Sequence, residues 1–278
     1  MSYLIEDKIK LKCLYKYYKS FLEETNEGKK FFKDREGRLE SRKKIKEKFE
    51  KLINDPNLSD FIAHPTDSPE LLEDVKKVFS ELWASTGKVI RPFVDENLHS
   101  IINTFIEKII KKHKENPSLI LSYDEINELT IRGKYTTKGG NQKDYTLGIK
   151  HFSELLCLLY PDKYFIINKS FQDFLNKLVS LGILSDQVKN IKINGLDKEN
   201  YNKLNNLIKE LNEILRDVDK NINNFYIDAF LYWLVDKKYS KWNADEIIKI
   251  KIQKYLEILK SKLNLYTYFQ TKRFQFDQ

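Results

Sequence analysis

The sequence predicts a mostly α-helical protein, a multi-helix globular domain with at most a short β-hairpin or strand pair. Glycine and proline, which interrupt helices, are scarce: 9 and 6 of 278 residues. Long stretches repeat apolar residues at intervals of three and four, which is the spacing of one helix face. The hydrophobic fraction of 41% supplies enough apolar side chains for a substantial core.

The predicted helices follow one another along the chain. The stretch FYIDAFLYWLV is apolar almost all round, so we expect it at the centre of the core. Residues 25–41 are polar and hold two glycines, which favours a loop, and IKINGLD at 191–197 resembles a short strand and turn. The expected helices are 3–24, 39–54, 69–84, 94–114, 123–129, 149–160, 169–181, 199–216, 225–235 and 244–264.

Several helix ends carry local signals. Ser122 is placed to cap the short helix that follows it, and Gly182 stands where another helix ends. His113 lies among lysines at the end of the 94–114 helix, where cations suit the helix dipole. We therefore expect His113, like His99, at the surface or at a helix end.

The clearest domain boundary is the connection 54–69, which has three prolines and little periodicity. We expect four parts on this basis. They are an N-terminal helical segment, a helical domain with a basic glycine-containing loop, C-terminal helices that pack on the same core, and an extended tail. Their residues are 1–60, 61–198, 199–264 and 265–278.

The overall charge and the cysteines set broad limits. A net charge of +8 and a pI of about 9.1 suit a polyanionic partner, and suit a solvated lysine-rich surface equally well. No run approaches the ~18 apolar residues of a membrane span, and the N-terminus lacks the apolar core of a secretory signal. Cys13 and Cys157 lie in apolar helical patterns, which favours reduced core residues. We expect a cytoplasmic protein.

Catalytic and nucleotide-binding motifs are not found. The glycines of TTKGGNQK lack the spacing and the ending of a phosphate-binding loop, and the four histidines have no zinc-site spacing. PDKYFIINK resembles the carboxylate and lysine of a nuclease only superficially, because its flanks are helical. Asp217 and Asp219 fit solvated helix ends. We therefore expect no enzymatic activity, metal or cofactor in this chain.

The best candidate for a binding site is the basic loop 131–148, which holds four of the nine glycines. Lysine and arginine neutralise phosphates, tyrosines stack on bases, and glycine lets the backbone approach a ligand. A solvent-exposed basic connection is the alternative reading. Trp83 is a further aromatic candidate, with a place in the core as its alternative. The candidate DNA-binding residues are Arg132, Lys134, Tyr135, Lys138, Lys143 and Tyr145.

The stretch LYPDKYFIINKS at 159–170 breaks the helical pattern. Pro161 ends one helix, and Asn168 or Ser170 can cap the next. The aromatic and branched residues between them are expected to pack against the core. This composition favours a structural elbow over a binding site.

That elbow also carries a resemblance to a known family. HFSELLCLLYPDKYFIINKSFQDFLNKLVSLG, YNKLNNLIKELNEIL and FYIDAFLYWLV together resemble the region before the AAA+ motor of McrB-type restriction GTPases. The terminal TKRFQFDQ resembles the entry to that motor. The resemblance covers roughly residues 150–278, and the family's GTPase residues are not in this sequence.

The resemblance implies a role in modification-dependent restriction. In that family the N-terminal region recognises DNA with modified cytosine, the motor hydrolyses GTP, and a McrC-type nuclease cuts. The implied partners are double-stranded DNA, an AAA+ GTPase domain in the same protein and a McrC-type nuclease subunit. The chain would then be the N-terminal part of a longer protein, and its tail would lead to the motor domain. No membrane partner is expected.

Two hypotheses about function follow. In the first, the chain is the DNA-binding specificity module of an McrB-like restriction system. In the second, it is a helical adaptor domain that mediates protein–protein assembly without direct DNA contact. The basic loop separates them, because charge reversal there abolishes DNA binding only under the first hypothesis.

Overall fold

The computed structural model describes residues 4–54, 87–193 and 195–276, together with the single residues 56, 64, 69 and 73. The fold is mostly α, as the sequence predicts. About 70% of it is helical, and the described residues contain one two-stranded antiparallel sheet. The helix expected at 69–84, Trp83 and most of the boundary 54–69 lie outside the described residues.

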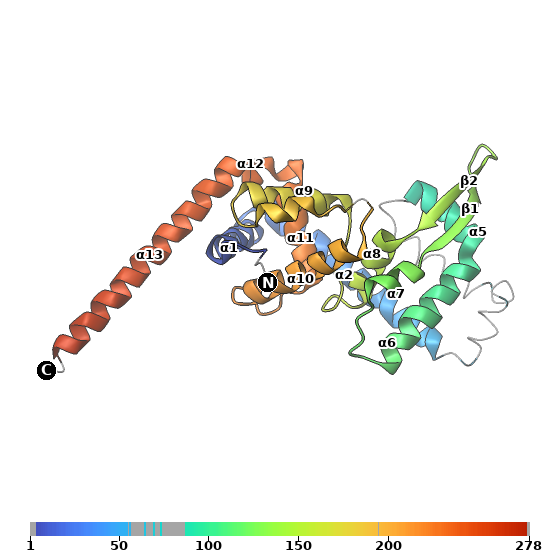
Figure 1. Ribbon diagram of the computed structural model, residues 1–278, viewed down its shortest axis with the longest axis horizontal. Helices are drawn as coiled ribbons and strands as arrows, with labels where there is room; N and C mark the ends of the chain where they lie inside the picture. The colour runs from blue at the N-terminus through green and yellow to red at the C-terminus, as the bar shows by residue number, and fades with distance from the viewer. Residues whose placement is uncertain are drawn as a thin grey trace. The chain divides into compact units, whose positions relative to one another are not determined.

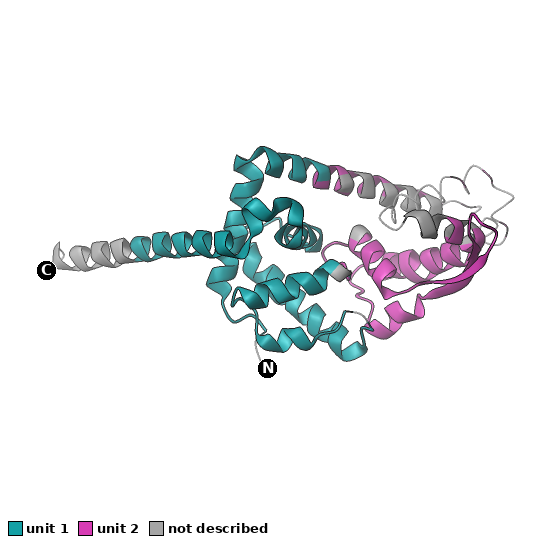
Figure 2. Cartoon of the chain, turned by 90° about the horizontal axis from the view of Figure 1, so that it is seen from above, with its two compact units in different colours: residues 1–34, 168–278 teal, residues 35–167 magenta. Residues whose placement is uncertain are grey.

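The chain divides into two compact units (Figure 2). Unit 1 combines residues 1–34 with 168–278, and unit 2 comprises residues 35–167. The four parts expected from the sequence have other boundaries, because unit 1 joins the N-terminal helix to the C-terminal helices. Unit 2 is therefore inserted into the sequence of unit 1.

Unit 1 is built from helices (Figure 1), and aromatic side chains fill its core. Trp233 of α11 is fully buried. The centre of its ring lies 5.2 Å from that of Tyr18 and 5.5 Å from that of Phe21, both on α1. The prediction of a central buried helix at 225–235 is confirmed, since α11 buries residues on every side. The elements are α1 (Lys8–Glu24), the start of α2 (Asn26–Ile53), α9 (Lys169–Ser180), η4 (Asp186–Asn190), α10 (Lys198–Arg216), α11 (Asn224–Val235), η5 (Lys237–Tyr239), α12 (Ser240–Asn243) and α13 (Asp245–Phe276).

Three local predictions in this part of the chain are wrong. The loop expected at 25–41 is helical, because Thr25 accepts a hydrogen bond from the Gly28 amide (2.9 Å) and starts α2. Gly28 is there for close packing, since a Cβ would lie 1.9 Å from the Phe21 carbonyl oxygen. The described residues of 191–197 form no strand, although Gly195 turns the chain at φ +74° as expected. The tail expected to be extended continues α13 as helix to Phe276, because no glycine or proline interrupts it.

Unit 2 places a β-hairpin against a bent helical segment. In α5, Asn97 departs from helical geometry at φ −117° and ψ 19°, and a π-helical stretch, η3, follows α5 directly. The elements are the remainder of α2, α5 (Gly87–Phe105), η3 (Ile106–Lys111), α6 (Lys112–Glu115), α7 (Tyr123–Glu128), β1 (Ile131–Thr136), β2 (Gln142–Leu147) and α8 (Ile149–Leu159).

His113 lies near the end of its helical segment in unit 2, as expected, but it is buried and not at the surface. Its Nδ1 lies 2.7 Å from the Ile109 carbonyl oxygen, and its Nε2 lies 2.8 Å from the Tyr164 hydroxyl. Tyr164 comes from the elbow, and its hydroxyl also accepts from the Leu121 amide (2.8 Å). Tyr164 of the elbow is buried, as predicted. The imidazole can be buried because both of its nitrogens have hydrogen-bond partners.

Capping signals are confirmed where the sequence shows them. Ser122 and Glu125 form a reciprocal capping box at the start of α7. Asn168 accepts a hydrogen bond from the Phe171 amide (3.1 Å) and caps α9. Gly182, at φ +65°, follows α9, and the Ile183 amide returns to the Leu178 carbonyl (2.9 Å).

Candidate nucleic-acid interface

The segment expected to be a basic loop is a β-hairpin. Strands β1 and β2 pair antiparallel from Ile131↔Leu147 to Thr136↔Gln142, and a tight connection joins them. The Thr137 amide donates to the Asn141 carbonyl (2.9 Å), and Gly140 turns the chain at φ +78°. Only glycine adopts that backbone geometry readily, so Gly140 is required by the turn itself.

The two faces of the hairpin differ because successive strand residues point to opposite sides. One face packs on α5 and includes Ile131, Gly133 and Tyr135. The other face is polar throughout, and all its side chains are exposed. Its members are Arg132, Lys134, Thr136, Gln142, Asp144 and Thr146.

Polar contacts from α5 fix the hairpin in place. The Asn97 side-chain amide donates to the Phe93 carbonyl (3.0 Å) and to the Lys134 carbonyl (2.9 Å). The Glu96 carboxylate accepts from the Thr136 amide (2.6 Å). Gly133 allows this approach, since a Cβ there would lie 2.0 Å from Asn97 Oδ1. These hydrogen bonds therefore connect the bent part of α5 to the backbone of β1.

The two candidate tyrosines contribute to the packed side of the hairpin. Tyr135 is 7% exposed, and its ring meets that of Tyr145 edge-on at 6.2 Å. Tyr145 also meets Phe93 edge-on (5.2 Å), and its hydroxyl lies 3.1 Å from His151 Nε2. Burial raises the pKa of Tyr145 and lowers the pKa of His151. Base stacking on either ring would require it to leave these contacts.

The four candidate cations are all exposed. Arg132 and Lys134 stand on the polar face, Lys138 is in the connection, and Lys143 is on β2 near it. Asp144 lies directly opposite Lys134 in the strand register and reduces the local positive charge. Lys143 lies opposite Tyr135 in the register and so belongs to the other face, which means that the four exposed cations share the hairpin but not one face.

The sequence reasoning missed the polar neighbours of those cations. Thr136, Gln142 and Thr146 alternate with residues of the packed face, and this period of two was the signal for strands. Glu96 and Asn97 are remote in sequence from the hairpin. The sequence places Glu96 near the start of a predicted helix, but it gives no indication that Glu96 or Asn97 contacts the hairpin.

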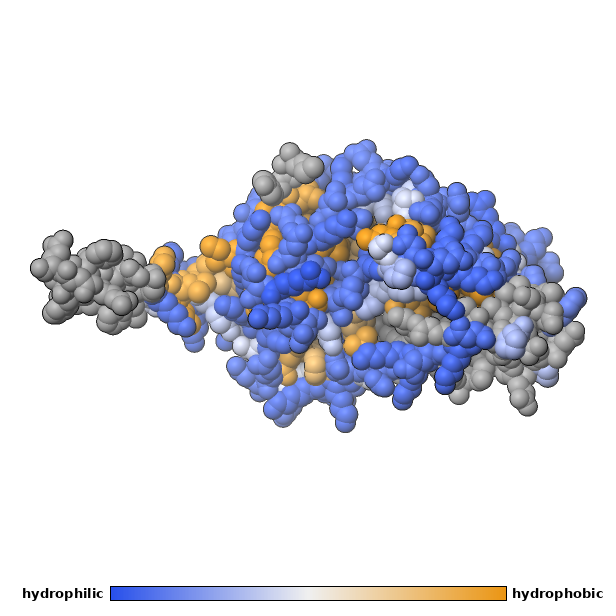
Figure 3. Space-filling view, turned by 90° about the horizontal axis from the view of Figure 1, so that it is seen from below, coloured by the Kyte–Doolittle hydropathy of each residue, from blue (hydrophilic) through white to orange (hydrophobic). Residues whose placement is uncertain are grey.

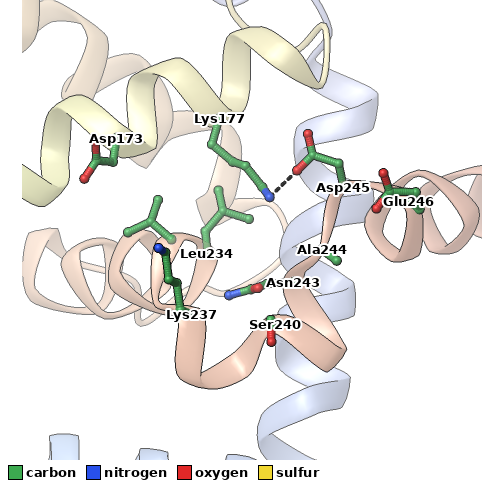
Figure 4. A pocket seen from close by; sticks show the side chains of 10 residues that line it. Asp173, Lys177, Leu234, Lys237, Ser240, Asn243, Ala244, Asp245 and Glu246 are labelled. Atoms are coloured by element: carbon green, nitrogen blue, oxygen red, sulfur yellow. Dashed lines mark ion pairs between the residues drawn. The ribbon is translucent and has the colours of Figure 1, made fainter.

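A second feature is an open hollow of about 470 Å³ in unit 1 (Figure 4). Lys177 of α9 points to Asp245 at the start of α13 and pairs with it, and Ser180 also donates to Asp245 (3.3 Å). Burial raises the pKa of Asp245, but the hydrogen bond and charge of Lys177 outweigh it, so the net shift is downward. Lys177 and Asp245 neutralise each other, and Asp173, Lys237 and Glu246 also line the hollow.

Other kinds of site gain no support from the described residues. Within the described ranges, no three His, Cys, Asp or Glu side chains gather closely enough to hold a metal ion. No described helix is both long and apolar enough to cross a membrane. Cys13 and Cys157 are both buried, in agreement with the predicted core positions.

Comparisons with known proteins yield no relative. No protein-family model, no curated protein and no solved structure matches the chain. The hairpin's geometry and chemistry are therefore the basis for assigning a function.

Proposed function

We propose that the β1–β2 hairpin binds double-stranded DNA and that the chain is the DNA-binding specificity module of an McrB-like restriction system. The observation that carries the proposal is the exposed two-stranded ribbon with its basic and polar outer face. Its attachment to α5 through Asn97 and Glu96 supports a preorganised element, which binds at a lower entropy cost than a mobile loop.

The dimensions of DNA suit such a ribbon. The major groove of B-form DNA admits an α-helix or a two-stranded β-ribbon. Lys138 and Lys143, near the end of the hairpin, are suited to contact phosphates, which supply most of the affinity. Arg132 can bond guanine and Gln142 can bond adenine through the edges that face the groove.

The McrB-like setting rests on the resemblance at the elbow and the helices after it. In this setting, an AAA+ GTPase domain in the same protein acts on the bound DNA, and a McrC-type nuclease subunit cuts it. The DNA read by the module includes DNA with modified cytosine. In this proposal the polar ribbon is the element that contacts the duplex.

Binding of fluorescent duplexes, with and without methylated cytosine, tests this function across a salt series. The variant combines Lys134→Glu, Lys138→Glu and Lys143→Glu. Its matched control combines reversals at three exposed lysines of unit 1, Lys192, Lys209 and Lys220.

We expect the hairpin variant to bind DNA about a hundredfold more weakly or worse, because it loses contacts to phosphates. The slope of log affinity against log salt concentration should also fall by ~0.9 for each phosphate contact that is lost. The unit 1 control should lose much less. Equal losses in both variants, or no salt-dependent binding by the unaltered protein, would contradict DNA binding through the hairpin. A preference for the methylated duplex would support the restriction setting.

The second candidate is a helical adaptor that assembles with a protein partner and does not touch DNA. Exposed apolar side chains on α13 favour it. Under this function the hairpin reversals leave assembly unchanged, and DNA binding is absent from the start.

A further inference from the structure

Most of the surface on the face that Figure 3 shows is hydrophilic, and hydrophobic residues appear there in small separate areas. Such a surface recognises a ligand mainly through charge and hydrogen bonds. The hollow of unit 1, about 470 Å³ in volume, presents both kinds of group (Figure 4). Its side chains come from α9, the end of α11, the segment from η5 to α12, and the start of α13. The hollow therefore combines polar groups from four segments around one space.

Asn243 supplies this hollow with a fixed hydrogen-bond acceptor. It is the last residue of α12, it is 5% exposed, and it lines the hollow. Its side-chain NH2 group donates to the carbonyl oxygens of Trp233 (2.5 Å) and Asp236 (3.0 Å). Those two acceptors fix the orientation of the amide, because its oxygen in that place would face two other oxygens. Within the described residues Asn243 Oδ1 accepts no hydrogen bond, so it is left for a donor from outside the chain.

The charges around the hollow favour a cation. Lys177 and Asp245 pair with each other. Asp173, Glu246 and Lys237 are exposed, and none of them forms an ion pair within the described part of the chain. Two carboxylates thus stand against one ammonium group. The unpaired groups carry a net negative charge, although Lys237 reduces it.

The helix ends at the hollow act in the same direction. Helix α11 ends there with Leu234 and Val235, and the C-terminal end of a helix carries partial negative charge. Helix α13 begins there, but Asp245 and Glu246 in its first turn offset the partial positive charge of that end. Leu234, Val235 and Ala244 add apolar surface along which a hydrocarbon chain can lie.

Together these features select a ligand group with a hydrocarbon chain and a cationic head that donates hydrogen bonds. An anion would meet the unpaired oxygen of Asn243 and an excess of carboxylate. A purely apolar group would leave these polar atoms without partners, at a cost in free energy. Ammonium and guanidinium groups carry only donors, and their alkyl chains pack on apolar surface while the head stays near water.

We propose that the hollow binds an alkylammonium or alkylguanidinium group. The head donates to Asn243 Oδ1 and is attracted by Asp173 and Glu246, and the alkyl chain lies along Leu234 and Val235. A lysine or arginine side chain of a peptide and a free amine both carry this chemistry. The proposal concerns unit 1 alone, so it does not depend on DNA binding by the hairpin of unit 2.

Three probes separate the chemistry of the ligand from its source. The first is a capped glycine–serine peptide with one central arginine. The second is the same peptide with citrulline, which has the shape of arginine without its charge. The third is agmatine, a free alkylguanidinium that also carries an amine. Each is titrated into the full 278-residue chain labelled with ¹⁵N, and the side-chain amide signal of Asn243 reports on binding.

The test variant combines Asp173→Asn with Glu246→Gln, which removes both unpaired carboxylates and keeps the shape of the side chains. Its matched control, Glu213→Gln with Glu257→Gln, removes two exposed carboxylates of unit 1 that do not line the hollow. A third variant, Lys237→Ala, removes the competing ammonium group. All five positions are exposed, so the variants should keep the fold.

We expect the arginine peptide or agmatine to shift the Asn243 signal, and the citrulline peptide to bind roughly tenfold more weakly than the arginine peptide. The test variant should bind the cation about fivefold more weakly, because it loses two exposed ionic contacts. The matched control should bind like the unaltered chain, and Lys237→Ala should bind more tightly.

Tighter binding of the peptide than of agmatine supports the proposal with a protein as the source of the cation, and the reverse supports it with a free amine. Equal binding of the arginine and citrulline peptides overturns the proposal. So does an Asn243 signal that neither cation shifts, or an unchanged affinity in the test variant.

Discussion

The contact between the hairpin and α5 depends most directly on Gly133. It leaves room for the Asn97 side chain, which bonds two carbonyls at once. We expect Gly133→Ala to push Asn97 away and to lower the free energy of unfolding by about 1–3 kcal/mol. Gly139→Ala is the control, because the nearest atom to its Cβ would be 4.0 Å away. Urea unfolding of both variants checks this, and equal stabilities would show that Asn97 is not constrained.

His113 makes the stability of the protein depend on pH. Burial lowers the pKa of His113 below its ordinary value of 6.5, with Lys163 and Lys112 adding to the effect against the hydrogen bond to Ile109. The Tyr164 hydroxyl, whose pKa burial raises to about 12, donates to the neutral ring, and a protonated ring could not accept. The unfolded chain thus takes up the proton more readily than the folded one.

We therefore expect full stability above about pH 6.5 and a decline as the pH falls below that value. His151, whose pKa is also lowered, contributes in the same direction. His113→Gln should reduce the slope of unfolding free energy against pH, and His99→Gln, at an exposed position, should not. Denaturant titrations between pH 5 and 8, roughly the histidine range, measure both slopes. Identical slopes for the two variants would exclude His113 as a source.

At the scale of single elements, the same substitution should act with opposite signs at two glycines. Gly182 ends α9 at φ +65°, so Gly182→Ala should cost about 1–2 kcal/mol of unfolding free energy. Gly37 lies inside α2 with nothing within 4 Å of its missing Cβ, so Gly37→Ala should stabilise by about 0.5–1 kcal/mol. Thermal melts of the two variants should therefore move in opposite directions.

The elements also show how far sequence patterns reach. Helices with clear periodicity and end signals, such as α9 with Asn168 and Gly182, are predicted closely. The start of α2 was missed because Gly28 indicated a loop, whereas its role depends on a backbone that packs against it. The cations of the hairpin were found from composition. The side to which each points, and the hold of Asn97 on β1, depend on pairings between distant residues that no local pattern contains.

At the scale of the whole molecule, unit 1 forms only when the N-terminal helix packs against helices from the C-terminal part of the chain. Unit 1 needs α1, which buries residues such as Tyr15, Tyr18 and Phe21 against helices from the far end of the chain. Periodicity predicts α1 but not its partners, so the division into units could not be read from the sequence. The compact unit that results has its two parts separated by all of unit 2.

Deleting residues 1–24 should therefore unfold unit 1 and leave the hairpin of unit 2 protected. Amide hydrogen exchange would show this as faster exchange throughout α9, α10 and α11, with slow exchange retained in β1 and β2. A similar deletion from the other end, of residues 264–278, removes only the far part of α13 and should leave that protection intact. Retained protection of α11 after the first deletion would contradict the dependence of unit 1 on α1.

The order of synthesis gives the interrupted layout of unit 1 a cost in the cell. The ribosome makes α1 first, yet Ile248 and Ile252, which belong to the helix that packs on it, are made near the end. At ~5–20 residues per second, the apolar face of α1 waits roughly 10–45 s for its partners. Throughout that interval the apolar side chains of the α1 segment are exposed at the N-terminal end of the nascent chain. Chaperones that hold emerging polypeptides are therefore expected to matter for the yield of this protein, more than for one whose neighbouring segments fold together as they emerge.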